Sequence, residues 1–319
     1  MKVILSLITL LTASPTFAAD KTIVRGTDHF ELVYEMTLPK LTKAGTLWIP
    51  LARTDAFQKI QVRAITSPVP WHKTRDAAHQ NEILVFKPTP ADSGKRIRIR
   101  YQVTRKEKQA HAEAGNAARH LKAEKLVPLN PRFTAIAKRI TAKTEGDRAR
   151  GKVLYDHVLA HMRYDKTGKG WGRGDALHAC DARTGNCTDY HAYFIALCRA
   201  AKIPARFAIG FTIPADRNAG AISGYHCWAE FFANDTNDTK GKWVPVDISE
   251  ADKHPELAAY YFGHHPANRL ELSRGRDIAV TPAPKSGPFN YFFGPHLEVK
   301  GKQVPVKATF EFKRLPAKK

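Results

Sequence analysis

The chain has 319 residues, a formal net charge of +21 and a hydrophobic content of 43%. That length and apolar fraction suffice for one large core or two moderate ones, and the ordinary Gly and Pro contents exclude a low-complexity chain. Lys and Arg are spread along the whole sequence, which is typical of a solvated surface that favours anionic envelope material. No nucleic-acid-binding motif accompanies this charge, so we expect no nucleic-acid partner.

The first 19 residues have the pattern of a secretory signal peptide. Lys2 precedes an apolar run over residues 3–11, and the small residues Ala18 and Ala19 stand where a signal peptidase would cut. The run is too short for a permanent anchor, and nothing downstream reaches about 18 unbroken apolar residues. We therefore expect an exported protein, periplasmic or secreted, without a transmembrane anchor.

Residues 20–105 have the pattern of a β-sandwich domain. Apolar and polar residues alternate over 30–38 and 96–103, and turn-forming Pro, Asp, Ser and Gly separate the segments. No catalytic constellation is evident in this part of the chain. Residues 106–130 are charged and rich in Ala, and we expect an exposed connection there that is in part helical.

From residue 131 the apolar period becomes helical, and we assign 131–319 to a catalytic domain with extra strands near its C-terminus. Helices are expected over 132–143 and 147–162, followed by a glycine-rich loop over 168–174. A third helix is expected over 188–201, with Cys187 at its start. Strands over 203–211, 226–232 and 243–247 follow it. Helices followed by strands indicate an α+β fold for this domain.

Cys187 stands where a cysteine nucleophile would be activated. A helix N-terminus places unpaired backbone N–H groups and the positive end of the helix dipole beside the sulfur, which favours the thiolate and would stabilise an oxyanion. His226 begins one expected strand, and Asp247 ends the next. If those strands are antiparallel neighbours, Asp247 can orient the imidazole and leave its other nitrogen for the sulfur.

Three ordered motifs resemble the transglutaminase-like superfamily, and in particular its bacterial members. They are Gly-Asn-Cys-Thr-Asp-Tyr-His at 185–191, Tyr-His-Cys-Trp-Ala-Glu-Phe at 225–231, and Trp-Val-Pro-Val-Asp at 243–247. The similarity spans about residues 130–250 and extends toward residues 268–277. The resemblance implies a papain-like core in which Cys187 is the nucleophile, His226 the general base and acid, and Asp247 the orienting residue.

The same resemblance implies an upstream aromatic or amide side chain at the oxyanion site. Tyr164 is the first candidate for that role and Trp171 the second. No cofactor and no metal are implied. The expected reaction is acyl transfer on the amide bonds of a protein or peptide substrate through a thioester. Hydrolysis is favoured, and the alternatives are cross-linking to an amine acceptor and a non-catalytic envelope-binding module on the same scaffold.

The remaining cysteines leave alternatives open. In an exported protein, four cysteines are often two disulfides, whereas their spacing matches no zinc motif. If Cys187 is the nucleophile, a disulfide joins at most two of Cys180, Cys198 and Cys227, and Cys180 is the preferred half. By strand alternation we expect Cys227 to point away from the site.

Several polar residues near the motifs are rivals for a functional role. We expect His191, four residues after Cys187, to be a packing or supporting polar residue rather than the base. Asp189 is expected to complement the helix dipole. His264, His265 and Glu271 match no metal site that the spacing supports.

Overall fold

The computed structural model describes residues 22–235 and 241–316. The signal-peptide prediction for residues 1–19 falls outside these ranges. Across them, every helix is too short or too polar to span a bilayer.

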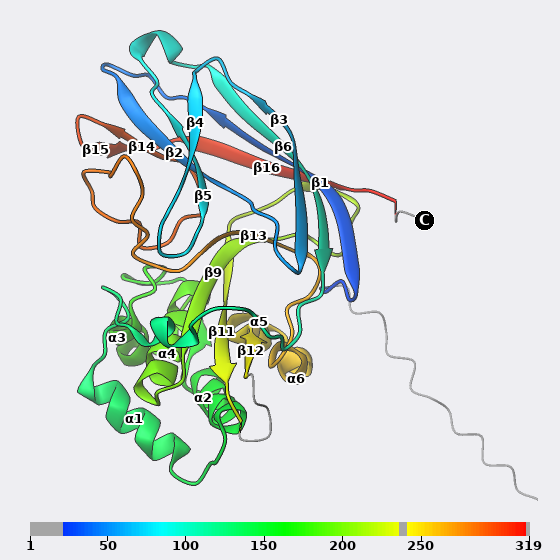
Figure 1. The fold of residues 1–319 in the computed structure, drawn as a ribbon, viewed down its shortest axis with the longest axis vertical. Helices are drawn as coiled ribbons and strands as arrows, with labels where there is room; N and C mark the ends of the chain where they lie inside the picture. Colours follow the sequence, from blue (N-terminus) through cyan, green and yellow to red (C-terminus); the bar gives the residue numbers. More distant parts are fainter. Residues whose placement is uncertain (1–21, 236–240, 317–319) are drawn as a thin grey trace, which may run out of the picture.

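One half of the molecule is a sandwich of two five-stranded antiparallel sheets (Figure 1). The first sheet contains, in spatial order, β10 (Ala219–Ala221), β16 (Lys307–Arg314), β1 (Thr27–Thr37), β6 (Arg96–Lys106) and β3 (Gln58–Thr66). The second contains β15 (Lys302–Val304), β14 (His296–Val299), β2 (Gly45–Leu51), β5 (Glu82–Phe86) and β4 (Trp71–Arg75). The core between them is apolar.

Alternating side chains explain why these segments form strands. In β6, Ile97, Ile99 and Tyr101 are buried, whereas the intervening Arg98 and Arg100 face solvent. β1 shows the same period, and the two strands pair along their whole length. Because a strand presents successive side chains to opposite faces, this pattern buries one face of the sheet and exposes the other to solvent.

The other half is built on a four-stranded antiparallel sheet in the order β12 (Lys242–Val246), β11 (His226–Ala233), β9 (Ala205–Thr212) and β13 (Arg269–Arg274). Helix α4 (Cys187–Ala200) packs on the face of β11 that carries Phe231, whose ring meets Phe194 edge to face at 6.0 Å. These residues belong to a second apolar core, separate from that of the sandwich.

Further helices surround α4 and the sheet. They are α1 (Pro131–Thr141), α2 (Asp147–His161), α3 (Ala176–Ala182), α5 (Ile248–Lys253) and α6 (Ala258–Tyr261), with 3-10 turns η2 (Ala117–Leu121) and η3 (Pro255–Leu257). A further 3-10 turn, η1 (Pro90–Asp92), connects β5 to β6 in the sandwich. A short parallel pair, β7 (Arg163–Tyr164) and β8 (Thr184–Gly185), joins the loop after α2 to the segment that enters α4.

The predicted α+β class and the N-terminal sandwich are confirmed. The extra strands expected at the C-terminus are divided between the two halves. β13 joins the sheet of β9 and β11, whereas β14, β15 and β16 complete the sandwich by pairing with β2 and β1. Placing all of them in a domain over 131–319 therefore needs correction, because the chain returns to its N-terminal strands. The other proposed domain limits stay a prediction.

The segment over residues 106–130 is exposed over much of its length and includes the 3-10 turn η2, as we expected of a partly helical connection, but some of its side chains are buried. Lys108 is fully buried, and His120 in η2 is nearly so. Lys108 and His111 form isolated bridges to His265 and Trp243. The segment thus runs between the two halves and contributes polar side chains to the space that they enclose.

Candidate active site

The N-terminus of α4 forms around Asn186. Its side-chain Oδ1 accepts from the backbone N–H of Thr188 at 2.9 Å, and Asp189 at the third helical position accepts from the Asn186 N–H at 3.0 Å. This reciprocal capping box fixes the first turn of the helix, so Cys187 stands at its positive end. Cys187 is 2% exposed, and it is one of the residues that line a cleft.

Asp189 also anchors the glycine-rich loop. Its carboxylate accepts from the backbone N–H groups of Gly172 at 2.6 Å and Gly174 at 2.9 Å. Burial raises the pKa of Asp189, although these N–H groups favour the charged form. Asp189 therefore does more than complement the helix dipole, which is the role that we expected for it, because it ties the loop that carries Trp171 to α4.

The strands bring His226 and Asp247 together as their spacing predicts. β11 and β12 are antiparallel neighbours, and Asp247 follows β12 as the N-cap of α5. The His226 Nε2–H donates to Asp247 Oδ2 at 2.7 Å, and both side chains are buried. The other ring nitrogen is left for Cys187, whose sulfur hydrogen-bonds the His226 ring.

The charges at this site reinforce one another. Burial by itself raises the pKa of the Cys187 thiol, but hydrogen bonds from Cys227 and His226 and the charge of His226 hold it well below its ordinary value. Burial lowers the pKa of His226, whereas Asp247 raises it to about 9 against the opposing charge of Arg269. Burial would raise the pKa of Asp247, but the charges of His226 and Arg269 keep it well below the usual range. A thiolate beside an imidazolium is the favoured state.

Arg269 is a member of the site that the sequence did not single out. Its guanidinium donates to Asp247 Oδ2 at 2.6 Å and to Thr212 Oγ1 at 2.8 Å, and it is 1% exposed. Burial lowers the pKa of Arg269, but the Asp247 carboxylate raises it above the ordinary value. The only hint in the sequence is that Arg269 lies in the stretch over 268–277 to which the family similarity extends.

A cleft of about 370 Å³ leads to Cys187 and His226. Tyr164 and Trp171 both line it, and Trp171 stands at its rim with 37% of its surface exposed. The β7–β8 pair places Tyr164 directly opposite Gly185, two residues before Cys187. Burial raises the pKa of Tyr164 to about 12, so its phenol remains a hydrogen-bond donor.

Residues 134–248 match the family model of the transglutaminase-like superfamily. The chain contains a transglutaminase-like core. The resemblance drawn from the three motifs is thereby confirmed, and the matched range includes Cys187, His226 and Asp247.

Two further comparisons cover most of the chain. A candidate cysteine protease from Cytophaga hutchinsonii has a solved structure that superposes with a TM-score of 0.59 at 15% identity, covering 92% of each chain, which shows a shared fold. A protein of Haemophilus influenzae described only as uncharacterized is 24% identical over 339 residues, covering 89% of each chain. The periplasmic domain of TgpA from Pseudomonas aeruginosa aligns at 18% identity with a TM-score of 0.36, which is too distant to support a conclusion.

Within the transglutaminase-like core, His191 supports the site without titrating near neutrality. Its Nδ1–H donates to the Cys187 carbonyl oxygen at 2.7 Å, and its Nε2 accepts from the Ile248 N–H at 3.1 Å. Burial lowers the pKa of His191, so the ring is neutral and both nitrogens are occupied. The structure therefore places His191 as a polar brace between α4 and α5, as we expected, and not as the base.

The four cysteines of the chain are all buried and free. The preference for Cys180 as half of a disulfide is therefore wrong for this structure. The prediction that Cys227 points away from the site is also wrong. Its sulfur lies 3.6 Å from His191 Nδ1 and hydrogen-bonds Cys187, because α4 covers the face of β11 that carries Cys227. Burial raises the pKa of Cys227 well above its ordinary value, so it is a neutral donor.

The other face of β11 points toward the sandwich. The Trp228 ring lies 6.0 Å from that of His226 and 5.7 Å from that of His265, and Glu230 is ion-paired with Arg206. The His265 Nε2–H donates to the Val246 carbonyl oxygen at 3.1 Å rather than joining a ligand set. Over residues 22–235 and 241–316, His, Cys, Asp and Glu side chains form no group of three suited to a metal ion.

Proposed function

We propose that this protein is an enzyme that transfers acyl groups from amide bonds through a thioester on Cys187. One observation carries the proposal. A thiol with a depressed pKa at the start of α4 contacts His226, whose other nitrogen is held at 2.7 Å by a buried, ionised Asp247. A nucleophile, a proton carrier and an orienting group in this order are the requirements of cysteine acyl transfer.

In the proposed reaction each of these residues has a separate step. The Cys187 thiolate attacks the amide carbonyl carbon, and the resulting oxyanion is stabilised by backbone N–H groups at the start of α4. His226 then gives its proton to the leaving amine as the C–N bond breaks, which leaves a thioester and a neutral imidazole. We propose that Tyr164, or Trp171 if Tyr164 does not reach, donates a second hydrogen bond to the oxyanion.

Water is the acceptor that we favour for the second half of the reaction. The cleft is open at Trp171, so water reaches the thioester by mass action. The neutral His226 takes a proton from water as it attacks, and breakage of the C–S bond returns the thiolate. The protein would then be a peptidase or amidase, whereas preference for a lysine amine would make it a cross-linking enzyme.

The two acceptors are distinguished by parallel assays on the mature chain. Amine release from amide-containing peptides and incorporation of a fluorescent primary amine are measured on the same samples, with Cys187→Ala as the blank. We expect release to exceed incorporation by at least about 10-fold. Incorporation exceeding release would assign the amine acceptor instead.

A non-catalytic binding module is separated from an enzyme by thiol reactivity. Iodoacetamide labelling near neutral pH should modify Cys187 faster than an unfolded cysteine, with the fully buried Cys198 as the internal control. Burial raises the pKa of Cys198, so that thiol should remain unlabelled. Equal labelling of Cys187 and an unfolded peptide thiol would refute an activated nucleophile and favour the binding module.

We also propose that the protein is exported and acts on protein or peptide material in an anionic envelope. The pattern of residues 1–19 and the net charge of +21 support this proposal. N-terminal sequencing of the protein from a periplasmic extract should begin near Asp20. A chain that retains residues 1–19 in the cytoplasmic fraction would contradict export.

A further inference from the structure

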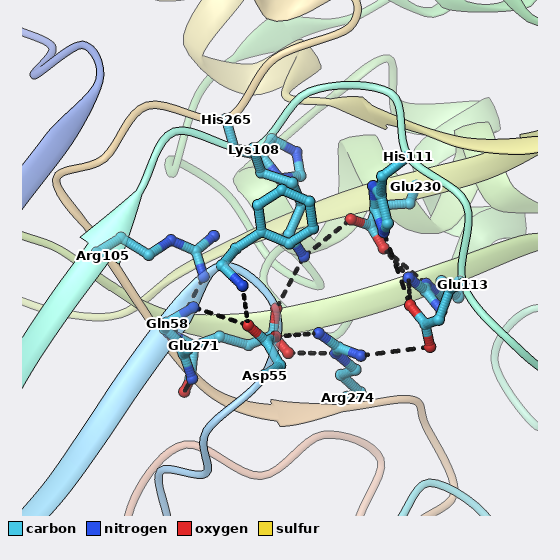
Figure 2. Close-up of polar contacts among 12 residues, drawn as sticks. Asp55, Gln58, Arg105, Lys108, His111, Glu113, Glu230, His265, Glu271 and Arg274 are labelled. Carbon is cyan, nitrogen blue, oxygen red and sulfur yellow. Dashed lines mark hydrogen bonds and ion pairs between the residues drawn. The ribbon is translucent and has the colours of Figure 1, made fainter.

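A second polar centre lies away from the cleft, between the sandwich and the sheet of the transglutaminase-like core (Figure 2). Its middle is Lys108, which is 0% exposed and lies 3.0 Å from Glu230 Oε1 and 3.6 Å from Glu271 Oε2. Glu230 belongs to β11 and Glu271 to β13, so the cation joins two strands of one sheet. We refer to this group and its ionic neighbours as the buried charge cluster.

Two arginines extend the buried charge cluster toward the surface. The Arg206 Nε donates to Glu230 at 2.6 Å, and its NH2 group donates to Glu113 at 2.7 Å. Arg274 pairs with Asp55 and, at 3.8 Å, with Glu113. Figure 2 shows the Glu113 carboxylate beside the guanidinium of Arg274. A carboxylate from the connecting segment thus already occupies part of an arginine-lined space.

A pocket of about 140 Å³ remains beside these arginines. It is bounded by Arg53 from the sandwich, Arg119 from the connecting segment, and Arg206 and Arg274 from the sheet. Glu113 supplies the one acidic side chain in its lining. Arg206 and Arg274 have carboxylate partners, but Arg53 does not, and its guanidinium forms no hydrogen bond or ion pair with any residue in the described part of the chain.

Burial and one neighbouring cation disfavour the charged form of Arg53. Burial and the charge of Arg274 lower the pKa of Arg53 more than the nearby carboxylates raise it. The same field acts on His120 in the pocket lining, where burial and the charges of Arg206 and Arg119 lower the pKa to about 3. His120 is therefore neutral, and the positive potential of the pocket is not relieved by the residues around it.

A count of charges indicates which ligand would balance this potential. The buried charge cluster and the pocket lining together hold six cations, namely Arg53, Arg105, Lys108, Arg119, Arg206 and Arg274. They hold four carboxylates, namely Asp55, Glu113, Glu230 and Glu271. The excess of two positive charges matches a dianion. The planar guanidinium of arginine can donate two parallel hydrogen bonds to a pair of phosphate oxygens, a geometry that the ammonium of lysine does not provide.

We propose that the pocket lined by Arg53, Arg119, Arg206 and Arg274 is a binding site for a phosphate monoester. The phosphate group occupies the small pocket, where its oxygens accept from Arg53 and from the outward N–H groups of the other arginines. A shallower depression of about 320 Å³ shares Arg53 and Gln80 with the pocket and is lined in part by Ala52, Ile60 and Val62. The organic part of the ester lies over this surface.

The site would couple the two halves of the protein. Arg53 follows β2 of the sandwich, whereas Arg206 and Arg274 belong to β9 and β13 of the sheet that carries His226. A ligand that bridges these arginines stabilises the folded state in which they face one another. It makes no contact with the Cys187 cleft, so its effect is on stability and not on the thioester chemistry.

Thermal unfolding of the mature chain tests the site. Inorganic phosphate and glycerol 3-phosphate are each added at up to about 20 mM, with sodium chloride adjusted to hold the ionic strength constant. We expect Tm to rise by ~2–4 °C in the wild type at ligand concentrations several-fold above Kd. Calorimetric titration should give one site per chain.

Arg53→Gln should abolish the rise, and Arg53→Lys should retain part of it. The control is Arg96→Gln, which removes the same charge from an exposed position on β6 and should leave the rise unchanged. Because Arg53 has no partner to lose, Arg53→Gln alone should not lower Tm in the absence of phosphate. A larger rise with glycerol 3-phosphate supports the ester. If only inorganic phosphate raises Tm, the ligand is not a phosphate ester. If neither compound raises the Tm of the wild type, or if Arg53→Gln shows the same increase, the proposed site is wrong.

Discussion

The substitution Asp247→Asn isolates the charge that sustains the thiolate–imidazolium pair. It keeps the shape of the side chain and removes the largest cause that raises the pKa of His226, while burial and the charge of Arg269 continue to lower it. The pKa of His226 lies at about 9, against an ordinary value of 6.5. That difference corresponds to about 3 kcal/mol of stabilisation of the imidazolium, which the variant loses.

The sign of the expected change follows from this linkage. His226 is charged below its folded-state pKa, so the wild-type pair persists until the pH rises through about 9. In Asp247→Asn the alkaline limb of kcat/KM should move down by two pH units or more. Near pH 7.5, which is one unit above the ordinary histidine pKa of 6.5, about a tenth of the His226 rings would remain protonated, so the activity should fall by roughly 10-fold or more.

The pH dependence of iodoacetamide inactivation provides a substrate-free assay of the same quantity. Its rate follows the thiolate of Cys187, which a less protonated His226 stabilises less, so the rising limb of the profile should move to higher pH in Asp247→Asn. Removing the partner of a buried arginine also costs about 3–5 kcal/mol of stability, so Tm is measured first and the assays are run well below it. Asp181→Asn, an isosteric change at an exposed carboxylate, is the control. An unchanged alkaline limb in a folded Asp247→Asn protein would refute the assigned role of Asp247.

Three further outcomes are expected from single changes. Arg269→Gln should lower kcat by about 10-fold or more while moving the alkaline limb upward, since the charge of Arg269 opposes protonation of His226; pH–rate profiles measure both effects. Tyr164→Phe should lower kcat more than KM if the phenol donates to the oxyanion, and Trp171→Phe should change mainly KM. Gly151→Val should destabilise the fold by about 1–3 kcal/mol in urea unfolding, because even a Cβ at this position would lie 2.3 Å from a buried ring of β11.

Each of these predictions would be contradicted by a specific result. A downward alkaline limb in Arg269→Gln would mean that its charge does not act on His226. Equal losses of kcat in the Tyr164 and Trp171 variants would leave neither as the specific oxyanion donor. Ala160→Val, at an exposed position of the same helix as Gly151, should cost only a few tenths of a kcal/mol. Equal destabilisation by both would point to helix propensity alone.

Local sequence signals predicted the parts of the site that depend on local structure. Cys187 follows a Gly-Asn pair that caps a helix, His226 starts an apolar strand, and Asp247 ends the next one. The antiparallel pairing of β11 and β12, which we stated as a condition, is present in the structure. Alternation correctly separated the two faces of β11, but it does not say which face a helix will cover. For that reason Cys227 was assigned to the wrong side.

Contacts between segments that lie far apart in the sequence were not predictable from the periodicity of apolar residues. Arg269 reaches Asp247 because β13 lies beside β9, and Lys108 is buried because two acidic strand residues face the connecting segment. The pairing of β16 with β1 joins positions such as Phe312 and Leu32. β4 was missed because four of its five residues are exposed, so it shows no apolar alternation.

Asp247 explains why the chemistry and the fold of this core depend on each other. One oxygen accepts from His226 on β11 and from Arg269 on β13, while the other accepts from the Glu250 N–H at 3.1 Å and so starts α5. The carboxylate can stay ionised in the interior because both charges face it. Arg269 lies beyond the range 134–248 that the family model matches. A fragment limited to that range would retain Cys187, His226 and Asp247, yet it would leave the buried carboxylate without its permanent counter-charge.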